Sequence, residues 1–458
     1  MPPHDPAYAD RPRLSARLVS LPPSHELARA ALGTPPLCDA LGVARWCGPT
    51  TSVCPRGLPE ITDVRDAVRQ CGLWPRGLEG RPLERRRWLD RLGPVPDVEE
   101  FVLPWRTAVR LGLVELGAGH AHPSRSLEQQ VRSPGHVLDW WANVFRTGVE
   151  QAQDHLSPGG TDDLLPQALR LLYEAPDGAR TPLETLARRA RSGPGTAHDN
   201  PGPARPEDVD RLLRALWRLT GTGAVVVGRH GSGTGDDARP FWASLTDLGR
   251  FGVRRILLAV GVPAPLVGEL TGAGELLDLL GTLSREGRLC SFDTWLAERT
   301  PARALREIAE AVRGPGLARR RWTGTKVLNS TSSEIVPDLW ALLDSGDPTA
   351  IGLGASVLLS SGMLAQHDID LIMDRHGPLV VIDMFAAALA PDETNLRAFL
   401  TSDCTEGIED VILDNVDRLR QDRHPDTVRV LEAIGRQHPD PGIAATAREA
   451  VERLASPP

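Results

Sequence analysis

Lysine is almost missing from this chain of 458 residues, because Lys326 is the single lysine among 52 basic residues. Arginine therefore carries nearly all of the positive charge. A bias towards GC-rich codons is the favoured explanation of this preference, and the alternative is selection of arginine for its ability to bind phosphate through two hydrogen bonds. Long apolar runs are missing too. Ile256–Val267 is too short to cross a bilayer and Pro378–Pro391 contains Asp383, so we expect no membrane-spanning helix and no membrane partner.

Cysteine is scarce, and the six cysteines form no Cys-x-x-Cys pair. Met1–Asp10 is rich in proline and has no apolar core of the kind found in signal peptides. We therefore expect reduced thiols and a cytoplasmic location. Four cysteines cluster near the N-terminus with gaps that do not fit a zinc site, which favours buried structural residues: Cys38, Cys47, Cys54 and Cys71.

Catalytic signatures are also lacking. No Gly-x-Ser-x-Gly, His-Glu-x-x-His or Walker motif occurs. The glycines of Gly231–Gly235 suggest a phosphate loop, but Asp236 and Asp237 follow them and would repel phosphate. A flexible hairpin loop is the favoured interpretation. We expect no catalytic residue and no cofactor, and a protein that is not an enzyme.

Two groups of residues could bind a metal in principle. His120 and His122 alternate along a predicted strand, but no third ligand is spaced to join them, so exposed polar positions explain them equally well. His367, Asp370 and Asp374 fall on one side of a predicted helix, where a solvated acidic face is favoured over a metal site. The sequence therefore predicts no metal.

Proline and glycine breaks, with 40 and 44 residues, punctuate the chain. Helical spacing over Ile61–Gly72 and Asp97–Leu111, followed by a short hairpin from Leu113 to His122, defines a first unit. Val137–Val149 predicts a further helix, whose aromatic residues suggest packing between units. The expected segments are a loose N-terminal segment at 1–36, a first unit at 37–150, a helical connector and linker at 151–205, a second unit at 206–262, a helical connector with a basic stretch at 263–333 and an acidic repeat domain at 334–458.

In the second unit the order of predicted helices and strands is clearer. Pro206 opens a helix with acidic residues in its first turn and leucines along one face. The strand Ala224–Val227 follows, then a glycine-rich loop, then a partner strand, Phe241–Leu245. Thr246 stands where a helix N-cap belongs. The order of helix, strand, loop, strand and helix is that of a winged helix.

A resemblance accompanies this order. Leu245-Thr246-Asp247-Leu248-Gly249-Arg250 resembles the junction that follows the wing in many bacterial winged-helix proteins. The first unit is similar in outline but lacks the Leu-Thr junction. The resemblance implies a mainly α fold with two winged-helix-like units that carry short β-hairpin wings, and it covers about a third of the chain.

From Glu334 onwards the sequence becomes acidic, with 9 basic against 22 acidic residues and a local charge of −13, whereas the preceding part sums to +5. Short amphipathic segments alternate with polar breaks, as stacked helices require. Asp347-Pro348, His424-Pro425-Asp426 and His438-Pro439-Asp440 are predicted helix starts, because proline suits the first turn and aspartate can cap. The region resembles an α-solenoid of HEAT-like repeats, and its charge would repel DNA.

These features favour a non-enzymatic DNA-binding or regulatory protein with tandem winged-helix units. The alternative is a protein-protein interaction scaffold or adaptor, in which the winged helices bind partners and residues 334–458 receive a basic protein. DNA is therefore a possible partner, and so is a protein. Arginine stripes on helices and one dense basic stretch give the candidate nucleic-acid-binding residues: Arg211, Arg214, Arg218, Arg250, Arg254, Arg255, Arg319, Arg320, Arg321, Trp322 and Lys326.

Overall fold

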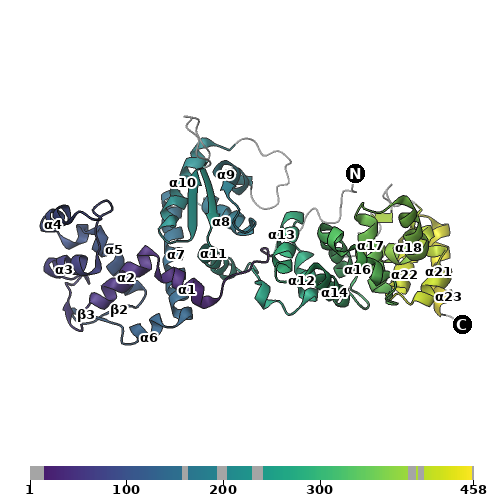
Figure 1. Cartoon of the computed structure of the whole chain (residues 1–458), viewed down its shortest axis with the longest axis horizontal. Helices are drawn as coiled ribbons and strands as arrows, with labels where there is room; N and C mark the ends of the chain where they lie inside the picture. The colour runs from purple at the N-terminus through teal and green to yellow at the C-terminus, as the bar shows by residue number, and fades with distance from the viewer. Residues whose placement is uncertain are drawn as a thin grey trace. The chain divides into compact units, whose positions relative to one another are not determined.

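The computed structural model describes residues 15–156, 163–192, 204–229, 241–389, 399–400 and 407–455. The fold is mainly helical and contains two small three-stranded antiparallel sheets (Figure 1). The predicted predominance of helix is confirmed. Within these described ranges, no helix has both the length and the apolar character needed to cross a membrane.

The chain forms two compact units. The sheet unit is Leu21–Gly261, and the helical unit is Val262–Pro458 together with Met1–Ser20. Residues 15–20 belong to the helical unit because Leu18 is fully buried there. Its backbone N–H donates to Ser291 Oγ at 3.0 Å.

The segment expected to be loose at 1–36 is packed from residue 16 onwards. Ala16–Val19 is buried in the helical unit. In the sheet unit, α1 (Ser24–Leu32) buries Leu27, Ala28 and Ala31, and it packs on α7 (Pro134–Leu156). The sequence gives little sign of this amphipathic helix, because its apolar face is made mostly of alanine and its hydrophobic pattern is therefore weak.

In the first module of the sheet unit, the strand that comes last in the sequence lies in the centre of the sheet. Its sheet is ordered β1-β3-β2, and Thr51 lies opposite Ala121. The helix predicted over Ile61–Gly72 is confirmed and ends where Gly72 adopts a left-handed conformation. The elements of the module are α2 (Pro35–Trp46), β1 (Thr51–Ser52), α3 (Ile61–Cys71), α4 (Pro82–Asp90), η2 (Val95–Asp97), α5 (Glu99–Arg110), β2 (Val114–Leu116) and β3 (His120–Pro123).

The second module repeats this order of elements, without described counterparts of α4 and η2. Its sheet is ordered β4-β6-β5, and Thr181 lies opposite Ala243 as Thr51 lies opposite Ala121. The module begins at α8, so part of 151–205, expected to be a connector, supplies its first two helices and a strand. The elements are α8 (Leu164–Glu174), β4 (Thr181–Pro182), α9 (Leu183–Ser192), α10 (Pro206–Thr220), β5 (Val225–Arg229) and β6 (Phe241–Leu245).

Helices α7 and α11 (Asp247–Ala259) complete the sheet unit, together with the short α6 (Leu127–Val131). Helix α7 contacts α2 of the first module and α10 of the second, which agrees with the expectation from its aromatic residues. Trp141 stacks on Phe145 with ring centroids 5.3 Å apart, and its indole N–H donates to Thr222 O at 2.9 Å. Helix α7 therefore lies between the two modules, and its Trp141 binds the second one.

The junction between β6 and α11 has a clear physical basis. Thr246 Oγ1 accepts the Gly249 N–H at 3.0 Å and donates to Gly223 O at 2.7 Å, so one hydroxyl caps the helix and fixes its position on the sheet. Gly249 lies so close to Ala224 that an added Cβ would come 2.0 Å from the Ala224 carbonyl oxygen. The threonine of this motif is thus required by its hydrogen bonds, and the glycine by the close packing of α11 on Ala224.

The helical unit stacks consecutive helices, with α16 on α17, α17 on α18 and α22 on α23. One core runs from Val267 to Ile372, so the connector expected at 263–333 shares its hydrophobic interior with the first of the repeats expected from 334 onwards, and a second core combines Ala318 with residues from Leu379 to Ala450. The elements are η3 (Val267–Glu269), α12 (Ala273–Leu280), α13 (Arg285–Leu296), α14 (Pro301–Ala311), α15 (Ala318–Leu328), η4 (Asn329–Thr331), α16 (Ser332–Leu343), α17 (Pro348–Ser360), α18 (Gln366–Ala388), α20 (Ile408–Leu413), α21 (Val416–Asp422), α22 (Thr427–Gln437) and α23 (Pro441–Ala455).

Candidate nucleic-acid interface

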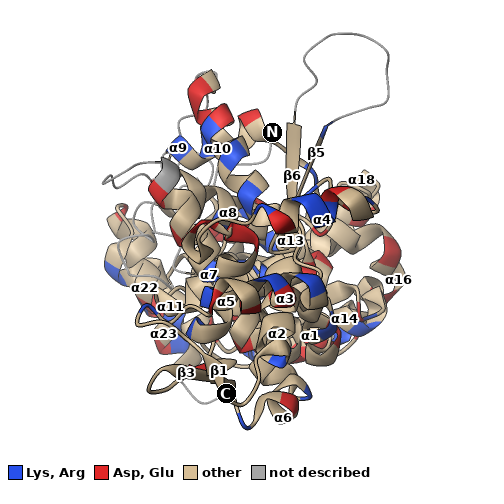
Figure 2. Cartoon of the chain, turned by 90° about the vertical axis from the view of Figure 1, so that its left-hand side faces the viewer, with Lys and Arg blue, Asp and Glu red and all other residues tan. Residues whose placement is uncertain are grey.

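Helix α10 separates its apolar and basic residues by face. Leu212, Leu216 and Leu219 are buried at helical spacing against the rest of the module. Arg214, Trp217 and Arg218 point to solvent, and Trp217 is 55% exposed. Figure 2 shows the blue basic segments along this helix. Because tryptophan normally buries most of its surface, an exposed indole between two arginines is a candidate contact for a ligand.

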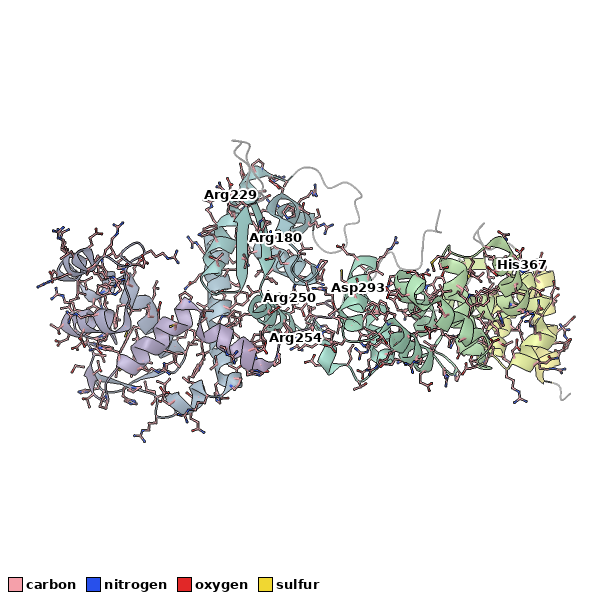
Figure 3. All side chains as sticks on the ribbon, in the orientation of Figure 1. Arg180, Arg229, Arg250, Arg254, Asp293 and His367 are labelled. Atoms are coloured by element: carbon pink, nitrogen blue, oxygen red, sulfur yellow. The ribbon has the colours of Figure 1, made fainter. Side chains whose placement is uncertain are left out.

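The hairpin formed by β5 and β6 provides the opposite wall of a groove. Val227, Arg229 and Phe241 lie on the same face of the hairpin because side chains alternate along a strand. The guanidinium of Arg229 lies 4.6 Å from the centroid of the Phe241 ring, a cation–π contact that holds it in place. Figure 3 shows Arg229 towards the tip of the hairpin. The groove encloses about 660 Å³, and its lining residues are Leu213, Arg214, Trp217, Arg218, Val227, Gly228, Arg229 and Phe241.

The charge of the groove is entirely positive among these lining residues, which include three arginines and no carboxylate. Arg214 Nε donates to the backbone carbonyl of Asp210 at 3.3 Å, a contact with a neutral group that does not neutralise the guanidinium. Asp208 is an acidic residue of α10 with a buried side chain. It already accepts two hydrogen bonds from Arg191, of 2.9 and 3.1 Å. The groove thus presents three guanidinium groups that suit an anionic ligand.

The other face of the hairpin is closed. A Cβ at Gly228 would come 2.5 Å from Trp242 Cζ2, so the indole of Trp242 lies directly against the glycine backbone. Arg180 covers this indole, with its guanidinium 4.6 Å from the ring centroid. Figure 3 shows Arg180 farther from the tip of the hairpin than Arg229. This stack stiffens the strand that carries Arg229.

Six of the sequence-predicted candidates belong to the sheet unit, and two of them, Arg214 and Arg218, line the groove. Arg211 lies 3.8 Å from Asp208. The three on α11 lie apart from the groove lining: Arg250 is buried with its Nη1 3.1 Å from Asp177, Arg255 pairs with Asp139 at 3.0 Å, and Arg254 is half-buried.

The dense basic stretch at 319–326 is a helix of the helical unit. Trp322–Ser333, whose sequence is polar and lacks helical periodicity, lies in α15, η4 and the start of α16. Arg321 is 1% exposed, so it is not available to a phosphate backbone. Arg320 makes a bidentate pair with Asp278 at 2.8 and 2.5 Å. Of the remaining candidates, Arg319, Trp322 and Lys326 are half-buried, and Lys326 Nζ lies 4.7 Å from the Trp322 ring centroid.

Sequence reasoning missed three side chains of the groove, Trp217, Arg229 and Phe241. Trp217 follows Arg214 at a spacing of three and precedes Arg218, so the helical stripe already contained the signal. Arg229 and Phe241 could not be placed in this way, because their position depends on the register of β5 against β6.

The corresponding surface of the first module is different. The structural repeat aligns the left-handed Gly112 with Gly223, since each immediately precedes the hairpin. This places Leu103 where the second module has Arg214 and Leu116 where it has Val227. Leu103 and Leu116 are 59% and 46% exposed. The first module therefore has exposed leucines at two positions that line the groove in the second module, while its helix α5 carries exposed arginines of its own at Arg106 and Arg110.

One cluster in the helical unit has the composition of a metal site. Asp383, His424 and Asp426 offer ligand atoms within 4.8 Å of one another, and no other group in the described part of the chain does so. The guanidinium of Arg321 donates to both carboxylates and to the carbonyls of Val312 and Gly314. Arg321 thus already supplies one positive charge to the two buried carboxylates, and His424 Nε2 lies 3.2 Å from Asp383 Oδ1.

The other residues considered for metal or phosphate lie as follows. His367, Asp370 and Asp374 are exposed on α18, in agreement with a solvated acidic face. His120 is exposed and His122 is half-buried on β3. The glycines of 231–235 lie outside the described residues.

No protein-family model, curated protein or solved structure matches the chain.

Proposed function

We propose that the two modules are winged helices and that the second one binds DNA. The order of elements and the position of the last strand between the other two support this assignment. In helix-turn-helix proteins the second helix enters the major groove, and α10 follows α9 in that position. The observation that carries the proposal is the groove beside α10, with three arginines and no carboxylate among its lining residues.

Each arginine has a suitable role in such a complex. Arg214 and Arg218 lie one turn apart on the exposed face of α10 and reach the same side of the helix. Arg229 lies across the groove on β5. Guanidinium groups on both walls would contact phosphates of the bound DNA, which fixes its position before any base is contacted.

The test is a salt titration of DNA binding with the full chain. Arg214→Ala/Arg218→Ala/Arg229→Ala is compared with the unmodified protein by fluorescence anisotropy, with a labelled duplex and with a labelled single strand. Because each phosphate contact contributes about −0.9 to the slope of log affinity against log salt, the triple variant should reduce the slope by about 2 to 3.

A matched control carries the same change in charge in the helical unit. Arg420, Arg429 and Arg453 are exposed there, and Arg420→Ala/Arg429→Ala/Arg453→Ala should leave the slope unchanged. Equal losses in the two triple variants, or a slope near zero for the unmodified protein, would contradict DNA binding through the groove.

A second candidate function is that of an interaction scaffold for a basic protein. Carboxylates are exposed on several helices of the helical unit, among them Asp338, Asp370, Asp374 and Asp414. The packing of consecutive helices supports a solenoid of HEAT-like repeats as the platform. An arginine-rich peptide should then bind the full chain, and Asp370→Asn/Asp374→Asn should weaken that binding without changing DNA affinity. Unchanged peptide affinity in this variant would argue against the role of α18.

A further inference from the structure

The groove beside α10 is concave and mostly apolar inside. Leu213, Trp217, Val227 and Phe241 contribute its apolar walls, while three guanidinium groups supply the polar part of the lining. A ligand that fits it must therefore combine a flat apolar body with negative charge. Nucleotides have this composition, with a base that stacks on aromatic rings and a phosphate that pairs with arginine.

Trp217 is the side chain best placed to stack. Its indole is 55% exposed at the groove, between Arg214 and Arg218 on the same helix face. Arg229 is held over Phe241 on the opposite wall at 4.6 Å. A base lying on Trp217 would thus have arginines on both sides of it, within reach of the phosphates that flank it.

The shape of the groove distinguishes an unpaired base from a duplex. A duplex accepts a convex helix into its major groove, and its stacked bases offer edges rather than faces. A hollow of about 660 Å³ between helix and hairpin cannot be filled by an intact duplex, but it can receive a base whose face is free.

We propose that this groove binds single-stranded DNA, with an unpaired base stacked on Trp217 and its flanking phosphates paired with Arg214, Arg218 and Arg229. The proposal rests on the proposed DNA-binding function and specifies the form of DNA. Single-strand binding uses stacking more than base-edge hydrogen bonds, so we expect little dependence on sequence.

The experiment measures the affinity of the full chain for a labelled strand of twenty thymidines and for a duplex of the same length, at one salt concentration. The single strand should bind at least about tenfold more tightly. Trp217→Ala should weaken single-strand binding by about 5- to 150-fold, the range observed for loss of one stacked base, with little effect on the duplex. Trp217→Phe should restore most of the affinity because it keeps an aromatic face.

A strand of the same length with abasic sites separates stacking from charge. It retains every phosphate, so the three arginines still contact it, but Trp217→Ala should leave its affinity unchanged. Leu258→Ala, which removes a 43% exposed apolar side chain from α11 of the same unit, serves as the control and should leave all affinities unchanged.

The outcomes distinguish the two proposals. Tighter or equal binding of the duplex, or an equal effect of Trp217→Ala on normal and abasic strands, would overturn the single-strand assignment while leaving DNA binding intact. If the triple arginine variant binds every DNA as well as the unmodified protein does, the proposed function itself fails.

Discussion

Aspartate at the start of a helix has two uses in the helical unit. Asp347 and Asp440 cap their helices, each accepting two backbone N–H groups through Oδ1. Asp426 occupies the equivalent place before α22, but its carboxylate accepts from Arg321 and from the N–H of Gly316. The same sequence signal therefore marks a helix start in all three cases, while the surroundings decide what the side chain does.

The cap at Asp347 should be measurable through its dependence on pH. Burial raises the pKa of Asp347, but the Thr349 hydroxyl and the N–H groups of Ala350 and Thr349 outweigh it, so the pKa lies below its ordinary value. The stabilisation is thus fully present at neutral pH and is lost as the pH falls through this lowered pKa. Asp347→Ala should cost about 1 kcal/mol at pH 7.

Hydrogen exchange of the α17 amides, measured with increasing urea at neutral and at acidic pH, tests this prediction. Asp347→Asn keeps an acceptor at the cap and should cost less than the alanine variant. A cost for Asp347→Ala that does not shrink in acid would show that the ionised carboxylate is not the source of the effect.

The cysteines differ in their expected reactivity. The expectation that the N-terminal four are buried is met by Cys47, whereas Cys38 and Cys54 are exposed and Cys71 is half-buried. Burial and the nearby carboxylates of Asp39 and Asp66 raise the pKa of Cys71 to about 11.

Backbone N–H groups of Leu58 and Arg56 lower the pKa of Cys54. Because the thiolate is the reactive form, iodoacetamide at pH about 8 should modify Cys54 at least about tenfold faster than Cys71. Peptide mass spectrometry after timed quenching gives both rates in one sample. Similar rates at the two cysteines would mean that Cys71 is more accessible, or less influenced by its neighbours, than its position indicates.

At the scale of elements, close approach between α11 and the sheet depends on a glycine. Gly249 should not tolerate a side chain, because its Cβ would lie 2.0 Å from the Ala224 carbonyl oxygen, a backbone atom that cannot rotate away. Gly249→Ala should therefore destabilise the sheet unit by about 2 kcal/mol or more, as overpacking does in close-packed interiors.

Gly135→Ala is the matched control in the same unit, since an added Cβ at Gly135 meets no atom within 4 Å. Urea unfolding followed by hydrogen exchange in α11 reports both variants. Equal stability of the two would indicate that α11 can shift away from the sheet at little cost.

The elements that could be predicted from sequence are those with a strong apolar period. Helices α3, α5 and α10 were predicted because valines and leucines recur at helical spacing, and the hairpin β5–β6 was predicted because valines adjoin a glycine-rich loop. The missed elements lack such patterns. Strand β4 is only Thr181–Pro182, and its pairing to Ala243 depends on a distant residue. Helix α15 shows no apolar period in the sequence, because its buried positions include Arg321, Thr323 and Thr325.

The candidate site was predictable in part for the same reason. A stripe of arginines on one helix is a local pattern, and Arg214 and Arg218 were found from it. The buried state of Arg321 was not predictable, because its partners Asp383 and Asp426 lie far along the chain. A basic run in a sequence therefore shows the number of charges, whereas the fold decides which of them face solvent.

At the scale of the whole molecule, basic and acidic residues serve different units. The groove with three arginines belongs to the sheet unit, and the acidic segment from 334 onwards belongs to the helical unit. Each unit has its own internal contacts, so damage to one core should leave the other folded. DNA binding and the integrity of the helical core can then be separated by mutation.

Substitution of Arg321 tests whether the helical core can be damaged without affecting DNA binding. Arg321 joins α15 to α18 and to the turn before α22 by pairing with Asp383 and Asp426, both of which are buried. Arg321→Met would leave two carboxylates without their cation inside the protein, and removal of one partner of a buried pair costs about 3 to 5 kcal/mol.

The neighbouring Arg320 is a matched control, because its pair with Asp278 is more exposed and should contribute about 0 to 1 kcal/mol. Hydrogen exchange should increase across α15, α18 and α22 in Arg321→Met and change little in Arg320→Met, while the sheet unit and its DNA affinity remain as in the unmodified protein. Addition of Asp383→Asn and Asp426→Asn to Arg321→Met should recover part of the lost protection, since the buried charges are then gone. If Arg321→Met also increased exchange in α10 and reduced DNA affinity, the two units would have to fold as one cooperative body.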